Sequence, residues 1–211
     1  MARGTRERIL DVSLAMFNAQ GEPHVTTNHI ADELGISPGN LYYHFRNKDD
    51  IVEHLFARYE AQLDEALLLP EARAANLEDI WLQLHLVFES LWDFRFLYRD
   101  LVDILARNRK LKLRFARIMS RAGTSASTLL RSLAASGAVR ANEDELRALV
   151  ENILLVTTFW MSYSAVRDGG RPVESGDLDR GIYQVMVLLA PFLPDEERVH
   201  LKRLAEEYAK I

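Results

Sequence analysis

The sequence predicts an all-helical protein. Apolar residues recur at spacings of three and four along most of the chain, which places them on one face of successive helices. No segment alternates convincingly between apolar and polar residues, and the sequence has no fixed-period repeat. With 211 residues and 48% hydrophobic content, the chain is long enough to bury a substantial core.

The first expected helix covers about residues 5 to 20. Ile9, Met16 and Phe17 lie on its apolar side, and Gly21 marks its end. Because shorter helices follow directly, we expect this helix to support them from one side.

Two short helices with clear start and stop signals are expected next. Thr26 suits the N-cap of a helix that runs to about Leu34, and Val25 and Ile30 have the spacing of a hydrophobic staple. Gly35 can adopt the left-handed conformation that commonly ends a helix. This pattern is typical of a helix-turn-helix unit.

The second short helix is expected to begin after Ser37. Ser37 suits an N-cap and Pro38 the first helical position, while Leu41 and Phe45 supply the face that must be buried. The other faces carry hydrogen-bonding side chains, namely Asn40, Tyr42, Tyr43 and His44. Such a surface is what a DNA-recognition helix needs.

Longer helices are expected in the rest of the chain. Asn47 can cap a helix that starts at Lys48 and whose apolar face continues to Leu63. The later helices are expected over about residues 77 to 93, 94 to 108, 110 to 136, 143 to 167, 177 to 189 and from 195 onward. A break is expected at residues 168 to 170, followed by a loop over 171 to 176.

The segment from Thr26 to Lys48 resembles the TetR family of bacterial transcription regulators. The resemblance rests on Thr26-Thr27, Ile30-Ala31, Leu34-Gly35-Ile36 and, most specifically, on GNLYYHFRNKDDI from Gly39 to Ile51. It is strong over about residues 5 to 55. It implies an N-terminal three-helix helix-turn-helix DNA-binding domain (1-48) joined to a larger helical effector-binding and dimerisation domain (49-211).

The resemblance also implies a DNA-binding surface on both short helices. Phosphate contacts are expected from Thr26, Thr27, Tyr43, His44 and Lys48, and contacts near base edges from Asn28, Pro38, Gly39 and Tyr42, with Ser37 and Asn40 on the same surface. The competing interpretation is that Thr26 and Ser37 only cap helices and that Tyr42 or Tyr43 only packs. Arg3, Arg6 and Arg8 either enter a minor groove or only solvate the start of the chain.

Composition restricts the partners. The formal net charge of -5 argues against a surface that binds nucleic acid everywhere, and residues 1 to 48 carry five basic and five acidic side chains. We therefore expect modest non-specific affinity and a double-stranded operator as the specific partner.

Composition also restricts the chemistry and the location. The absence of cysteine excludes disulfides and thiolate metal sites. No catalytic residues, metal site or cofactor are expected, because nucleophile elbows, phosphate loops, dinucleotide fingerprints and zinc-binding helices are missing from the sequence. No leader precedes the first helix, and the apolar run from Ile153 to Met161 is far shorter than the roughly 20 residues that span a bilayer. We expect a cytoplasmic protein without a membrane segment.

Two broad apolar faces in the C-terminal half need partners. One includes Leu146, Leu149 and Trp160, and the other belongs to the helix that follows Asp177. The resemblance implies that these helices form the four-helix interface of a homodimer. Two recognition helices held about 34 to 36 Å apart could then bind the half-sites of a palindrome.

An apolar cavity for a small-molecule effector is the second expected site. Its candidate lining is mostly aromatic and consists of His85, Phe88, Trp92, Phe96, Phe115, Met119, Phe159, Trp160 and Tyr163. The candidates to orient the ligand are His85, Asn108, Asn152, Thr157, Thr158 and Tyr163. For each residue, an ordinary core or surface position is the competing interpretation.

The run RNRKLKLR, from Arg107 to Arg114, concentrates positive charge. It is either a solvated helix end or the mouth of a site for an anionic ligand such as an acyl-coenzyme A. The stretches FRFLYRDLVDIL and IYQVMVLLAPFL resemble those of a TetR subgroup that regulates polyhydroxyalkanoate synthesis. That resemblance implies a hydrophobic, acyl-derived effector.

The predicted function is therefore a ligand-responsive transcriptional repressor. The effector is expected to tilt the helix that starts near Lys48 and so change the spacing of the two recognition helices. Two alternatives come from other classes: a small-molecule carrier or interaction protein with a vestigial DNA unit, and a helical enzyme. The intact recognition helix argues against the first, and the missing catalytic constellation argues against the second.

Overall fold

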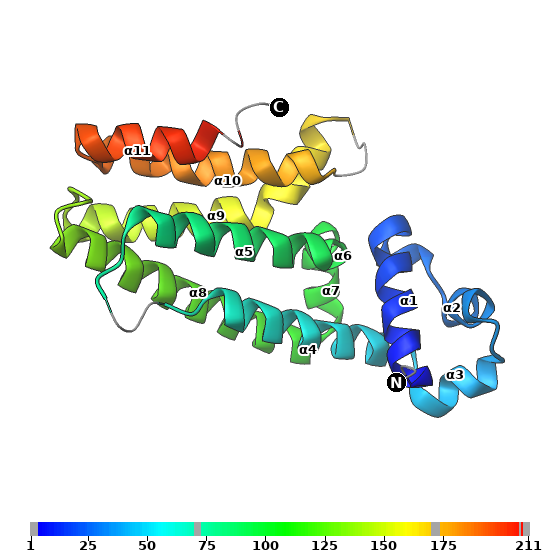
Figure 1. Cartoon of the computed structure of the whole chain (residues 1–211). Coiled ribbons are helices and arrows are strands. Elements are labelled where there is room, and N and C mark those ends of the chain that lie inside the picture. Colours follow the sequence, from blue (N-terminus) through cyan, green and yellow to red (C-terminus); the bar gives the residue numbers. More distant parts are fainter. Residues whose placement is uncertain (1–3, 70–72, 170–173, 207, 209–211) are drawn as a thin grey trace. The chain divides into compact units, whose positions relative to one another are not determined.

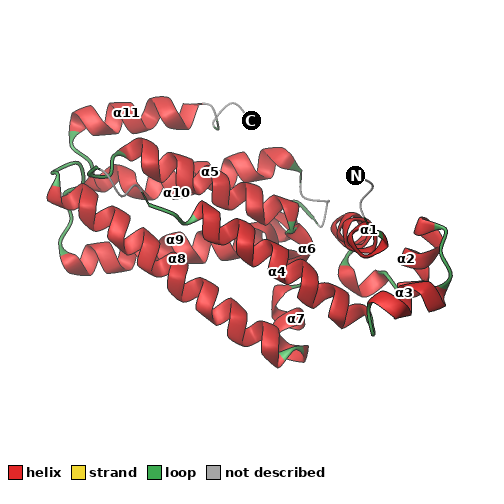
Figure 2. Cartoon of the chain, turned by 60° about the horizontal axis from the view of Figure 1, so that its bottom comes forward, coloured by secondary structure: helices red, strands yellow, loops and turns green. Residues whose placement is uncertain are grey.

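The computed structural model describes residues 4–69, 73–169, 174–206 and 208, and throughout these ranges helices are joined by turns and loops without any strand (Figure 2). The all-helical prediction is confirmed. Arg3 lies outside the described residues, and so do residues 170–173 of the expected break and loop.

The helices follow one another closely along the chain (Figure 1). The N-terminal elements are α1 (Thr5–Gln20), the 3-10 turn η1 (Glu22–His24), α2 (Thr27–Leu34), α3 (Pro38–His44) and α4 (Lys48–Ala66). The later elements are α5 (Leu77–Asp93), α6 (Arg95–Arg99), α7 (Leu101–Arg107), α8 (Arg109–Ala135), α9 (Glu143–Arg167), α10 (Ser175–Leu189), the 3-10 turn η2 (Ala190–Phe192) and α11 (Asp195–Glu206).

The single helix expected over residues 94 to 108 is instead two short helices, so this expectation was wrong. α6 and α7 meet at Asp100, whose φ of -111° and ψ of 21° are not helical. Three consecutive residues of α6, Phe96, Leu97 and Tyr98, are all buried. Since one face of a helix cannot contain three consecutive residues, tertiary burial rather than periodicity shapes this segment.

The chain divides into two compact units. Unit 1 consists of residues 1–62 and 93–113, and unit 2 consists of residues 63–92 and 114–211. Unit 1 therefore combines the helix-turn-helix with α6 and α7, two helices from the second of the predicted domains. The predicted functional boundary between residues 48 and 49 stays a prediction.

The core of unit 1 is continuous from α1 to α6. Ile9, Phe17, Ile30 and Leu41 are fully buried. The ring centroids of Phe17 and Phe96 lie 5.3 Å apart. The first helix therefore supports both α2 and α6, as its apolar side led us to expect for α2.

The core of unit 2 includes a close crossing of α10 with its neighbours. A Cβ atom added at Gly181 would lie 2.4 Å from Cε1 of Phe88 and 2.7 Å from Cδ1 of Trp160. The Trp160 indole N–H also donates to the carbonyl oxygen of Asp177. The absence of a side chain at Gly181 thus lets α10 lie directly against two large aromatic rings.

α9 is a long helix of unit 2 that contains an extended apolar stretch. By length and composition alone it could cross a membrane, and only 33% of its most apolar stretch is buried. The core helix of a soluble protein meets the same criterion, so a single such helix is weak support for a membrane span. Its limited burial nevertheless shows that much apolar surface remains uncovered within one chain.

Candidate DNA-binding surface

The start of α2 is held by a reciprocal cap. Oγ1 of Thr26 accepts a hydrogen bond from the backbone N–H of His29 at 3.2 Å, and the Thr26 N–H donates to Nδ1 of His29 at 3.4 Å. Val25 and Ile30 are both fully buried, which is consistent with the expected staple. Thr26 was expected as this cap, whereas His29 was not, because glutamate or glutamine usually occupies this position of the capping box.

A tight turn then leads into α3. Gly35 has φ 64° and ψ 33°, the left-handed conformation expected at this helix end. The Ile36 N–H donates to the Ala31 carbonyl oxygen at 3.0 Å. Oγ of Ser37 accepts from the Asn40 N–H at 3.2 Å, so Ser37 is the N-cap of α3. Local backbone chemistry therefore sets the direction in which α3 leaves the turn.

The outer face of α3 exposes most of the predicted contact residues. Leu41 and Phe45 are buried, whereas Tyr43 is 85% exposed and Tyr42 is 50% exposed. The exposed predicted residues on the two helices and their caps also include Thr26, Asn28, Ser37, Pro38, Gly39 and Asn40, while Thr27 and His44 are half-buried. α3 thus separates an apolar inner side from an outer side of hydroxyl, amide and imidazole groups.

Two side-chain contacts organise this surface. Oγ1 of Thr27 and the hydroxyl of Tyr42 lie 3.0 Å apart, which joins the start of α2 to α3 by a hydrogen bond. The rings of Tyr43 and His44 meet edge to face, with centroids 5.1 Å apart. Both tyrosines nevertheless keep a large exposed area, so their predicted contacts with DNA stay a prediction beside the interpretation that they only pack.

Lys48 has a different environment from the other predicted phosphate contacts. Its ammonium group donates to the backbone carbonyl of Glu22 at 2.9 Å and lies 3.0 Å from the Glu22 carboxylate. The Glu22 side chain is completely buried and also pairs with Arg107. Glu22 was not expected to have a role, because no sequence pattern indicates that η1 turns this carboxylate inward.

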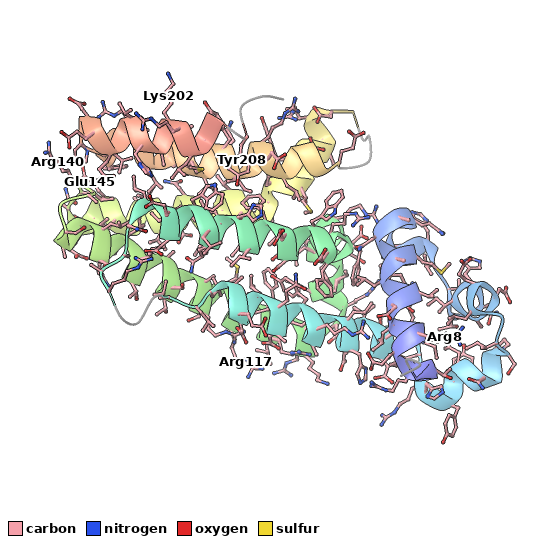
Figure 3. The ribbon with its side chains drawn as sticks, in the orientation of Figure 1. Arg8, Arg117, Arg140, Glu145, Lys202 and Tyr208 are labelled. Atoms are coloured by element: carbon pink, nitrogen blue, oxygen red, sulfur yellow. The ribbon has the colours of Figure 1, made fainter. Side chains whose placement is uncertain are left out.

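The N-terminal arginines described by the structure have unequal environments. The guanidinium of Arg6 lies 5.0 Å from the Phe45 ring centroid, a cation–π distance. Arg8 is exposed on α1 (Figure 3). Neither position distinguishes a minor-groove role from simple solvation, so both interpretations of these residues remain predictions.

An ion cluster fastens α4 to α1 behind this surface. Nη1 of Arg58 lies 2.8 Å from Oδ1 of Asp11, and Arg58 also contacts Glu7. Burial lowers the pKa of the Arg58 guanidinium, but its hydrogen bonds to Asp11 and Glu7 outweigh burial and raise that pKa above its ordinary value. α4 is therefore held to the supporting helix of the DNA-binding unit.

The predicted effector residues do not share one environment. Phe96 belongs to unit 1, where it packs on Phe17. Phe159 and Tyr163 are exposed, at 44% and 56%. In unit 2, Trp160 and Phe88 are buried side by side at Gly181. Only part of the predicted set is therefore placed to line a cavity inside unit 2.

The remaining effector candidates also lie in unit 2. Phe115 is buried, and Sδ of Met119 accepts a hydrogen bond from Oγ1 of Thr158 at 3.7 Å. Trp92 is half-buried. His85 stacks on the Trp81 ring with centroids 5.8 Å apart and lies 3.4 Å from Glu89. A hollow of about 290 Å³ between α10 and α11 shares no residue with the predicted lining.

Two bases of the run that begins at Arg107 form ion pairs within unit 1. Arg107 contacts Glu22, and Lys110 lies 2.5 Å from the Glu53 carboxylate. Oδ1 of Asn108 accepts from the Leu111 N–H at 3.1 Å and so caps α8. These residues hold helices together, which leaves the expected mouth for an anionic ligand as a prediction.

Comparison with known protein families identifies the chain. A family model described as TetR, bacterial transcriptional repressor, matches residues 58–201, and one described as bacterial regulatory proteins, tetR family, matches residues 9–55. The chain belongs to the TetR family. The resemblance first noted around α2 and α3 thus extends to the helices of the C-terminal half. TetR proteins are regulators of transcription, in agreement with the prediction of a regulator rather than an enzyme.

Several TetR relatives show how far the similarity extends. A TetR-family regulator from Marinobacter aquaeolei VT8 is 40% identical and has a TM-score of 0.89, with 98% of this chain and 99% of that chain covered. The regulator TtgW of Pseudomonas putida is 36% identical over 63 residues, which are 30% of this chain and 47% of TtgW. SmeT, the repressor of a Stenotrophomonas maltophilia multidrug efflux pump, has been solved with triclosan; that structure is 21% identical, with a TM-score of 0.61 and coverage of 92% and 94%.

The two kinds of comparison cover different parts of the relatives. The chain spans less than half the length of TtgW, whereas it spans nearly all of the Marinobacter structure. The similarity to the Marinobacter regulator therefore includes the whole fold, whereas the similarity to TtgW is limited to a short segment.

Proposed function

We propose that this TetR protein is a homodimeric, ligand-responsive repressor that binds a palindromic double-stranded operator through α2 and α3. One observation carries the proposal: the outer face of α3 exposes Tyr42, Tyr43 and Asn40 while Leu41 and Phe45 are buried beneath it. Exposed rings with hydroxyl groups are suited to a polar partner, and DNA supplies acceptors at both phosphates and base edges.

The side chains divide into positioning and reading groups. The hydroxyls of Thr26, Thr27 and Tyr43, together with the His44 imidazole, are suited to donate hydrogen bonds to phosphate oxygens. Asn28 can pair with adenine, and Tyr42 can contact a thymine methyl or donate to a base edge. Gly39 has no side chain to hold the backbone away from the duplex. These contacts would fix both register and sequence preference.

Dimerisation is supported by an uncovered apolar stripe on α9. Leu155, Phe159, Tyr163 and Val166 follow spacings of four, four and three residues and are between 44% and 83% exposed. Those spacings place the four side chains on one side of the helix. On α10, Val187 is 42% exposed as well. Pairing α9 and α10 with the same helices of a second subunit would remove this surface from water.

Effector binding is supported by polar atoms inside unit 2. Among the described residues, Oγ1 of Thr157, Oγ of Ser164 and Nε1 of Trp81 are buried without a hydrogen-bond partner. Because an unpaired buried donor is costly, a ligand with acceptor groups would stabilise this region. Triclosan, bound by SmeT, is an example of a small molecule held by a protein of this fold. An acyl-derived effector, together with the polyhydroxyalkanoate subgroup, is the narrower form of the proposal.

The proposed switch requires the effector to prefer one conformer. A ligand that binds the DNA-competent and DNA-incompetent forms equally would shift neither population. Preference for the form in which α4 is tilted would change the distance between the two recognition helices and release one half-site.

The direct test combines operator selection with a double substitution. An operator is first selected from random duplexes with the wild-type protein. Tyr43→Ala together with Lys48→Ala should then weaken binding to it by at least about 100-fold, because each lost phosphate contact reduces affinity. Lys202→Ala is a matched control, since Lys202 points from α11 into solvent (Figure 3). Unchanged operator affinity in the double variant, with helicity and subunit number intact, would contradict the proposed surface.

A further inference from the structure

We propose that Glu22 and Arg107 act as positioning residues for DNA binding. In this proposal Arg107 keeps the buried Glu22 carboxylate neutralised, so that Lys48 is free to move from Glu22 to a DNA phosphate. The inference rests on the proposed operator binding and adds a means by which the end of α7 sets DNA affinity.

The cluster places one fully buried acid, Glu22, between two bases, and Asp49, Asp100 and Asp103 lie at its edge. Oε1 of Glu22 lies 3.0 Å from Nζ of Lys48, and Oε2 lies 2.5 Å from Nη2 of Arg107. Glu22 belongs to η1, Lys48 is the first residue of α4, and Arg107 is the last residue of α7. All three residues belong to unit 1. The cluster therefore joins the DNA-binding helices to α7 within one compact unit.

Burial makes the number of bases important. The Glu22 side chain has no exposed area, and a buried carboxylate without a counter-charge is strongly unfavourable. Glu22 needs one cation, and the cluster holds two. One base can therefore move away while the other still neutralises the buried Glu22 carboxylate.

Lys48 is the base that is suited to leave. Its side chain is 26% exposed, and its ammonium is a point charge on a flexible four-carbon chain. Arg107 has further anchors, because its guanidinium lies 3.5 Å from Asp103 and 3.9 Å from Asp49. Lys48 also follows α3 by only a few residues, next to the predicted phosphate contacts.

Loss of Arg107 should therefore act on DNA binding indirectly. With Arg107 absent, Lys48 becomes the principal counter-charge of Glu22 and is retained by it. The duplex then loses one phosphate contact although no residue of the DNA-binding surface has changed. A displacement of the end of α7 that separates Arg107 from Glu22 would have the same effect, which would make the cluster sensitive to the conformation of α7.

Salt dependence distinguishes this role from simple structural support. The logarithm of operator affinity falls linearly with the logarithm of salt concentration, and each phosphate contact contributes about 0.9 to the slope. A residue that only stabilises the fold changes the amount of active protein and leaves that slope unchanged. Displacement of Lys48 from the phosphate should make the slope shallower.

The experiment measures operator affinity over a range of salt concentrations for the wild-type protein and three variants. Arg107→Met should weaken binding about tenfold at low salt and reduce the slope by about 0.9. Glu22→Gln, which releases Lys48, should bind at least as tightly as the wild type with an unchanged slope. Glu22→Gln combined with Arg107→Met should return to within about threefold of wild-type affinity, because no buried acid remains to hold Lys48.

Each outcome supports or overturns the proposal. Failure of the double variant to recover the affinity or slope lost in Arg107→Met would overturn it, and so would an Arg107→Met variant with wild-type affinity and slope. Circular dichroism shows whether Arg107→Met folds. If it does not fold, the operator affinity of Glu22→Gln tests the proposal by itself. Binding about tenfold weaker than that of the wild type would show that Glu22 does not restrain Lys48 and would overturn the proposal. Failure of the wild-type protein to bind any selected duplex would instead contradict the proposed function.

Discussion

Helix α3 of unit 1 and helix α9 of unit 2 expose opposite kinds of side chain. On α3, the large exposed residues are Tyr42 and Tyr43, which carry hydroxyl groups. On α9, the exposed stripe is mainly apolar, as Phe159 and Val166 illustrate, while the hydroxyls of Thr157 and Ser164 are buried. The first surface suits a polar duplex, and the second suits a protein surface of its own kind.

The two regions also differ in what determines their structure. In α2 and α3, backbone hydrogen bonds to Thr26 and Ser37 and a left-handed glycine define each helix end locally. In α9 and α10, the arrangement depends on aromatic rings that meet from separate helices at Gly181. Substitutions in α2 and α3 should therefore disturb only the nearby helix end, whereas substitutions in α9 and α10 should disturb several packed helices of unit 2.

The largest effect is expected for Phe159→Glu on the exposed stripe of α9. A carboxylate buried between two subunits would lack a counter-charge, so the dissociation constant of the dimer should rise by at least about 100-fold, or roughly 3 kcal/mol. Sedimentation velocity over a concentration series would measure it. Val199→Glu, at a residue of α11 that is 53% exposed, is the control and should leave the dimer intact. If the Phe159→Glu variant still forms the dimer, the interface does not lie on this stripe.

An intermediate effect is expected for Gly181→Ala at the α10 crossing. The added methyl would lie 2.4 Å from Cε1 of Phe88, so the free energy of unfolding should fall by about 1–3 kcal/mol. Gly123→Ala is a matched control on α8, because its added Cβ would lie 3.5 Å from Leu154, an ordinary contact. Alanine favours helix formation, and the control should gain up to about 1 kcal/mol. Equal responses of the two variants in chemical denaturation would refute tight packing at Gly181.

The smallest effect is expected for Ser37→Ala at the N-cap of α3. Loss of the hydrogen bond from the Asn40 N–H to Oγ of Ser37 should lower the free energy of unfolding by about 1 kcal/mol. Ser37→Gly should lower it by only a few tenths of a kcal/mol, since glycine is also tolerated at an N-cap. Thermal unfolding of the three proteins provides the comparison. A glycine variant less stable than the alanine variant would show that the hydroxyl cap is not what defines this helix end.

Much of the fold followed from local sequence signals because those signals act through the backbone. Thr26, Gly35 and Ser37 each mark a helix end by a hydrogen bond or a dihedral angle that depends on near neighbours. The apolar spacing of α1 likewise predicted that Ile9 and Phe17 would be buried. The exposed face of α3 followed from the same periodicity, since burial of Leu41 and Phe45 leaves the tyrosines outside.

Periodicity could not determine the features that depend on distant segments. It did not divide residues 94 to 108 into α6 and α7, because three consecutive buried residues require surroundings on several sides. It also could not place Phe159 and Tyr163 on an exposed stripe or Phe96 beside Phe17, since an apolar side chain has the same pattern in a cavity, a core or an interface.

The sequence by itself determined the helical class, the helix-turn-helix unit and the polar character of its outer face, because helix caps, turns and amphipathic spacing are local. Only the tertiary structure decided that Glu22, Lys48 and Arg107 form one cluster. Those residues are separated by 26 and 59 positions along the chain. A buried acid and its two bases can be identified only after η1, α4 and α7 have been brought together, since ion pairs depend on distance and burial rather than on sequence spacing.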